Sequence, residues 1–107
     1  MVAARSDGAW AFPDPPDVAV FTCWRILRGE EWIHFVAHDQ DDGAWKFHPH
    51  LFAPESEAAV VALKTIVALD PSVSILSDLP RGWCAWREAR NAPWRRALKS
   101  EYEPAGR

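Results

Sequence analysis

Cysteine is scarce in this 107-residue chain, and so are long apolar runs. The two cysteines, Cys23 and Cys84, stand too far apart for a zinc motif and are too few for a disulfide framework. No apolar run approaches the roughly 18 residues that a transmembrane helix needs, and the N-terminus lacks the apolar stretch of a secretory signal. We therefore expect a cytoplasmic protein with reduced thiols and no membrane contact.

The sequence also lacks the motifs of common catalytic sites. It contains no glycine-rich phosphate loop and no G-x-S-x-G nucleophile turn. Both cysteines lie in predicted strands, where a thiol is usually an inert packing residue. Asp41 and Asp42 are neighbours in a predicted turn, where solvation leaves them no acid–base role. We expect no catalytic residue and no cofactor, so an enzyme is the less favoured class.

Charge is distributed unevenly along the chain. The formal net charge of −3 argues against nucleic acid as a partner. Residues 1–57 hold ten acidic and four basic side chains, whereas residues 58–107 hold five acidic and eight basic ones. Two interpretations remain open: the halves attract each other within one fold, or a polarised surface orients a partner.

Three segments differ in composition. Residues 1–17 form a proline-rich N-terminal arm, since "FPDPPD" favours polyproline II and forbids helix. Trp10 and Phe12 in this arm either fold back onto the domain or pack on a second subunit. Residues 18–95 form one domain, and residues 96–107 form a C-terminal tail.

β-branched and aromatic residues predict strands at 18–24, 32–38, 44–48 and 83–89. Alternation in the second strand places Ile33, Phe35 and Ala37 on one face. Asp42 and Gly43 form a strong hairpin signal, because glycine accepts a positive φ. The connections 28–31 and 39–43 are too short for parallel crossovers, so we expect antiparallel pairing.

Helical signals follow in the second half. Residues 57–69 are ambiguous, because their Val-Val pair also fits a strand. Asp70 is a cap and Pro71 suits the first helical position, with Ile75, Leu76 and Leu79 as the apolar face. A turn at Gly82 leads into the last strand. The pattern predicts a single α+β domain, with a small, mostly antiparallel sheet of about four strands and one or two short helices.

"HDQDDGAWKFHPH" (38–50) concentrates three histidines and three aspartates. A calcium loop counted from Asp39 places glycine at the fifth position instead of the sixth, and ends in His50 instead of glutamate. His38, His48 and His50 with an aspartate could form a zinc site, which makes a small metal-dependent hydrolase the alternative function. We predict a hairpin turn here and no metal site.

Seven tryptophans are more than a core of this size hides easily. We expect Trp24 and Trp45 in the core. Trp83 and Trp86 are three apart, so on a strand they cannot both face inward. Tryptophan and arginine dominate binding hot spots. The predicted partner-binding surface comprises Trp83, Trp86, Arg87, Arg90 and Trp94, and its partner is another protein or a second copy of the chain.

Several stretches, namely "GEEWIHFVAHDQDDGAWKF", "LKTIVALDPS", "DLPRGWCAWR" and a late "APW", resemble a family of short bacterial proteins. That family has no known function and is related to the immunity protein 33 group, whose members are thought to sit beside toxin genes. The resemblance covers about residues 18–95. It implies a non-enzymatic module that neutralises a protein partner, and it brings no catalytic residues.

Overall fold

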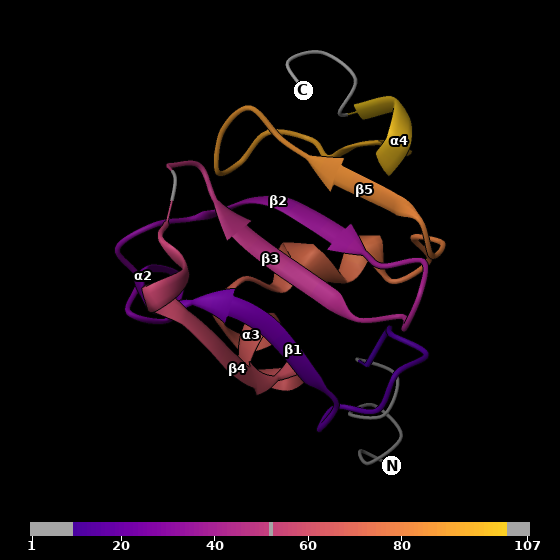
Figure 1. Ribbon diagram of the computed structural model, residues 1–107. Coiled ribbons are helices and arrows are strands. Elements are labelled where there is room, and N and C mark those ends of the chain that lie inside the picture. The colour runs from indigo at the N-terminus through magenta and orange to yellow at the C-terminus, as the bar shows by residue number, and fades with distance from the viewer. Residues whose placement is uncertain (1–9, 52, 103–107) are drawn as a thin grey trace, which may run out of the picture.

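The computed structural model describes residues 10–51 and 53–102, which form one α+β domain around a single mixed sheet (Figure 1). Six strands lie in the order β4-β1-β3-β2-β5-β6. The strands are β1 (Ala19–Cys23), β2 (Ile33–His38), β3 (Trp45–Pro49), β4 (Ala58–Ala62), β5 (Trp83–Trp86) and β6 (Arg95–Leu98). The helical segments are α2 (Trp24–Leu27), η1 (Glu55–Glu57), α3 (Leu63–Leu69), η2 (Pro71–Leu76) and α4 (Lys99–Tyr102). The α+β class is confirmed, but the expected sheet of about four strands is too small.

β1 and β3, which are neighbours inside the sheet, run parallel. Phe21 of β1 lies opposite Lys46 of β3, and β1 pairs antiparallel with β4 on its other side. The other neighbouring pairs of the sheet are antiparallel. Antiparallel pairing of the first two strands was expected from their short connection. That prediction is wrong because β3 lies between β1 and β2, so the two strands are not neighbours.

The hairpin between β2 and β3 turns at Asp42 and Gly43. The Asp39 amide donates to the Ala44 carbonyl at 2.9 Å, and the Ala44 amide donates to Asp42 Oδ1 at 3.0 Å. Gly43 has a φ of 72°, in the left-handed region that side chains with a branched Cβ avoid. The polar stretch is therefore placed in a tight turn, as its Asp-Gly pair indicates.

We expect Gly43→Val to lower the free energy of unfolding by about 1–3 kcal/mol, because a β-branched residue is strained at this φ. A Cβ at this position would also lie 2.5 Å from Arg81 Nη2 and displace that side chain. Urea unfolding measures the effect. Gly43→Asn is the matched control, since asparagine tolerates a positive φ, and it should retain most of the stability. Equal stability of the valine variant and the wild type would contradict the assigned turn conformation.

An irregularity in β2 changes which of its side chains face the core. The register with β3 shifts between Ile33 and Phe35, so Ile33 and Val36 are both buried in the core although they are three residues apart. Phe35 instead contacts His48 and Tyr102 on the other face. The prediction that Ile33, Phe35 and Ala37 share one face is therefore wrong after Ile33, because the register shift interrupts the period-two pattern. Ala37 is nevertheless buried.

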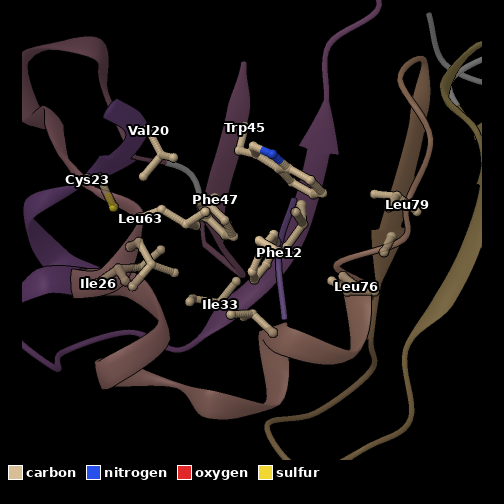
Figure 2. Close-up of a cluster of buried hydrophobic side chains, with 14 residues drawn as sticks. Phe12, Val20, Cys23, Ile26, Ile33, Trp45, Phe47, Leu63, Leu76 and Leu79 are labelled. Atoms are coloured by element: carbon tan, nitrogen blue, oxygen red, sulfur yellow. The ribbon is translucent and has the colours of Figure 1, made fainter. Parts of the chain in front are cut away.

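The core lies between one face of the sheet and the helical segments α2, α3 and η2 (Figures 1 and 2). Val20 and Phe47 contribute from the sheet, and Leu63 and Leu76 contribute from the helices. Figure 1 is seen from the other face of the sheet, with α3 behind the strands. None of the helices in the described part of the chain is long and apolar enough to cross a membrane.

The described part of the N-terminal arm, residues 10–17, folds back onto this core. Phe12 is buried and meets the Trp45 ring edge-on, with ring centroids 5.2 Å apart (Figure 2). Trp10 packs beside it and donates from Nε1 to the Asp14 carbonyl at 2.8 Å. Of the two tryptophans expected in the core, Trp45 is 1 % exposed but Trp24 is 50 % exposed. The Trp24 assignment is wrong because β1 ends at Cys23 and Trp24 begins α2.

The chain after residue 95 continues the sheet. β6 pairs antiparallel with β5, and α4 follows it directly. The segment expected as a tail, residues 96–107, is thus part of the domain up to residue 102. The rest of that tail and residues 1–9 of the arm lie outside the described residues.

Candidate functional site

The histidines of the polar hairpin do not meet. Because β3 alternates, Trp45 and Phe47 face the core while His48 points from the opposite face. His38 stacks on Trp45, with ring centroids 3.9 Å apart, and its Nδ1 donates to the Leu79 carbonyl at 2.7 Å. His50 lies beside Trp32 and His34 instead. In residues 10–51 and 53–102 no three His, Cys, Asp or Glu side chains gather in a metal-binding arrangement.

The five residues predicted to bind a partner lie in three different places. Trp83 packs against the core, whereas Trp86 lies on the opposite face of the sheet and contacts Tyr102, with ring centroids 4.6 Å apart. Arg87, Arg90 and Trp94 line one pocket of about 550 Å³. The predicted surface is thus divided by the sheet, and the pocket keeps three of its members together.

The walls of this pocket come from segments far apart in the sequence. One wall is the end of α3 with η2, and the other is the loop after β5 together with the start of β6. We call it the arginine pocket, and its main lining residues are Asp70, Ile75, Arg87, Arg90, Trp94 and Arg96. The lining of the pocket therefore includes three arginines and one carboxylate.

Arg87 is the structural anchor of the pocket. It is 1 % exposed, and its Nη2 donates to Asp70 Oδ2 at 2.6 Å. Its Nη1 donates to Ser72 Oγ at 3.0 Å and its Nε to the Ile33 carbonyl at 2.8 Å. This side chain ties β2 and η2 to the end of β5. The expectation of an exposed Arg87 is corrected, because its guanidinium is used inside the domain.

Asp70 both caps η2 and neutralises Arg87. Its Oδ1 accepts hydrogen bonds from the Ser72 amide and hydroxyl, and Pro71 occupies the first helical position. Burial acts to raise the pKa of the Asp70 carboxyl, but the hydrogen bonds from Ser72 and Arg87 and the guanidinium charge outweigh it. The pKa is thereby lowered, and the carboxylate stays ionised beside Arg87.

Trp94 and the two outer arginines form the open part of the pocket. The Arg87 guanidinium carbon lies 4.3 Å from the centroid of the Trp94 ring, which fixes the indole by a cation–π contact. Arg96 donates to Asp78 Oδ1 and to the Ile75 carbonyl, each at 2.8 Å. Arg90 is exposed and makes no hydrogen bond or ion pair within the described residues. Its charge is available to a ligand.

Arg96 and Ile75 are lining residues that the sequence did not predict. Ile75 was expected on the apolar face of a helix, but it is 65 % exposed. The buried residues of this segment are Val73, Leu76 and Leu79, a spacing of three that belongs to a 3₁₀-helix. This spacing of three in the sequence could have predicted that Ile75 lies outside the core.

No protein-family model, no curated protein and no solved structure matches this chain. The resemblance noted in the sequence therefore remains an expectation.

Proposed function

We propose that this chain is a non-enzymatic protein-binding module that receives an acidic segment of a protein partner in the arginine pocket. The observation that carries the proposal is the excess of positive charge there. Arg87 is paired with Asp70, and Arg96 is paired with the exposed Asp78. Arg90 is left without an ion-pair partner in the described residues, beside an exposed isoleucine. Arginine and tryptophan are the residues most enriched at binding hot spots, and arginine matches the bidentate geometry of a carboxylate.

Each side of the pocket suits a different part of such a segment. Arg90 offers an unpaired guanidinium, and Arg96 adds a second positive charge whose partner Asp78 is itself exposed. Leu69 and Ile75 present exposed apolar side chains for an apolar neighbour of the acidic residue. The buried pair of Arg87 and Asp70 holds the walls in place before binding, which reduces the entropy lost on association.

An immunity-type role agrees with this proposal. The resemblance to proteins related to the immunity protein 33 group implies neutralisation of a toxin by direct contact. A small domain with a preformed cationic pocket would occlude the partner without changing it chemically. The metal-dependent hydrolase has less support, because the histidines and aspartates it needs lie apart.

We expect Arg90→Glu to weaken the binding of an acidic peptide about tenfold or more, the equivalent of roughly 1.4 kcal/mol. The probe is a fluorescent peptide in which glutamates alternate with leucines, and fluorescence anisotropy measures its affinity. The same peptide with glutamine in place of glutamate should bind weakly to the wild type. Arg90 makes no hydrogen bond or ion pair with the described residues, so thermal unfolding should change little.

Arg95→Glu is the matched control, since Arg95 carries the same charge but lies opposite Trp86 in the sheet and does not line the pocket. It should leave peptide affinity nearly unchanged. Equal losses in the Arg90 and Arg95 variants would mean that only net charge matters, and the pocket would then not be the binding site.

A further inference from the structure

β4 is an edge strand that carries none of the usual protection against pairing. Its sequence, AAVVA, holds no charge and no proline, and within the described residues it pairs only with β1. Edge strands commonly carry charged residues that prevent association with another chain. The opposite edge does so, because β6 begins with Arg95 and Arg96. β4 is therefore the unprotected edge of this sheet.

The register shows which backbone groups of β4 point outward. The Leu63 amide donates to the Val18 carbonyl at 2.8 Å, and the pairing of β1 with β4 continues in the same register. Hydrogen-bonded and non-hydrogen-bonded pairs alternate in an antiparallel ladder. Ala59 and Val61 therefore direct their amides toward β1, whereas Ala58, Val60 and Ala62 direct theirs away from the sheet.

We propose that β4 pairs antiparallel with β4 of a second copy of this chain, around a two-fold axis at Val60. The outward amide and carbonyl of Val60 then bond those of Val60 of the partner subunit, and Ala58 meets Ala62 of the partner subunit. The two six-stranded sheets join into one continuous sheet. Such an interface is isologous and closed, so it ends at a dimer.

The charges that flank β4 favour a second copy in this orientation. Glu55 and Glu57 lie before the strand, and Lys64 follows it. Glu57 is paired with Arg25 and Lys64 with the exposed Asp17, so Glu55 and the exposed Lys64 are the charges that can reach a second copy. Antiparallel pairing of two copies brings the acidic start of one strand to the basic end of the other, at both ends of the interface. Parallel pairing would place like charges side by side, which is unfavourable.

The exposed face of the sheet adds an apolar contribution. Val60 is 59 % exposed and lies opposite Phe21, which is 42 % exposed, on the face away from α3. In the dimer these two side chains continue into Val60 and Phe21 of the partner subunit, in one row across the junction. Cross-strand pairs of aromatic and β-branched residues stabilise sheets. The backbone edge of β4 and the apolar side chains on the adjacent sheet face thus both favour the antiparallel dimer.

Val60→Pro tests this interface without disturbing the domain. Proline lacks the outward amide, and proline is tolerated on edge strands where the amide faces solvent. We expect the variant to stay folded and its dimer dissociation constant to rise about 100-fold, tenfold for each of the two symmetric hydrogen bonds lost. Sedimentation equilibrium over a range of protein concentrations measures this constant. Val61→Pro is the matched control, since it removes a hydrogen bond to β1 and should destabilise the domain itself.

Amide hydrogen exchange gives a second measurement on the wild-type chain. The Val60 amide should exchange more slowly as protein concentration rises, while the Val61 amide should be protected at all concentrations. A wild-type chain that stays monomeric at concentrations of about 100 μM or more would overturn the proposal. A dimer that persists unchanged in Val60→Pro would overturn it too. The arginine pocket lies at the β5–β6 end of the sheet, so peptide binding remains measurable in either case.

Discussion

Replacing Arg87 with alanine should lower the free energy of unfolding by about 3 kcal/mol, at the lower end of the cost of breaking a buried ion pair. The lower end applies because the Asp70 side chain is 21 % exposed, so water partly solvates the carboxylate left behind. The Ile33 carbonyl and Ser72 hydroxyl also lose their donor. Urea unfolding followed by tryptophan fluorescence measures the change.

This loss should depend on pH. The pKa of Asp70 is lowered in the folded domain, so the pair stabilises the fold above the ordinary pKa of aspartate. That contribution disappears as the pH falls through the lowered pKa. The difference in the free energy of unfolding between wild type and Arg87→Ala should therefore be largest near neutral pH and should become smaller in acid.

Two further variants show whether the ion pair is the cause. Arg90→Ala removes an exposed arginine from the same pocket and should change stability by less than about 0.5 kcal/mol. Arg87→Lys keeps the charge but not the three directed hydrogen bonds, so it should recover only part of the loss. A stability difference that is constant from neutral to acid pH would show that Asp70 is not the partner that matters.

Trp45→Ala should cost about 3–5 kcal/mol, the usual range for deleting a large aromatic side chain from a core. The Trp45 ring stacks on His38 and contacts Phe12, and its Nε1 donates to Asp14 Oδ1 at 3.2 Å. The variant therefore loses core volume and the attachment of the N-terminal arm together. Domains of this size are stable by only about 5–15 kcal/mol, so much of the stability disappears.

Trp24→Ala is the matched control, because this indole is half exposed in α2. It should cost less than about 1 kcal/mol. Trp45→Phe keeps an aromatic ring but not the hydrogen bond to Asp14, and should fall between the two. Limited proteolysis near residue 14 reports the arm separately, and cleavage should be faster in Trp45→Ala. Equal costs for the two alanine variants would contradict the assignment of Trp45 to the core.

Local signals in the sequence predicted the local features of this fold. β-Branched and aromatic residues located strands at β1, β2, β3 and β5, and Asp42 with Gly43 indicated the turn between two of them. These signals reflect the backbone preferences of a few neighbouring residues. Such preferences do not depend on distant segments, so the folded domain retains the local structures that they favour. β4 was only half recognised, because its two valines fit a helix as well as a strand.

Features set by distant segments could not be predicted in the same way. The bulge in β2 appears only when β3 is aligned beside it, and the parallel pairing of β1 requires the later strands to be known. Arg87 looked like a surface residue because charged residues after a strand usually are. Its burial depends on Asp70, which lies 17 residues earlier and reaches it only after η2 packs on the sheet.

The position of β1 between β3 and β4 also sets an order of events during protein synthesis. β2 and β3 are joined by a tight turn, so they can pair as soon as Pro49 has left the ribosome. β1 is made earlier than either, yet the partner on its outer side is complete only at Ala62. The first strand to be translated therefore waits for the fourth, and the backbone groups on the outer side of β1 stay unpaired in the interval. Slow translation that delays the emergence of Ala62 from the ribosome would prolong this interval.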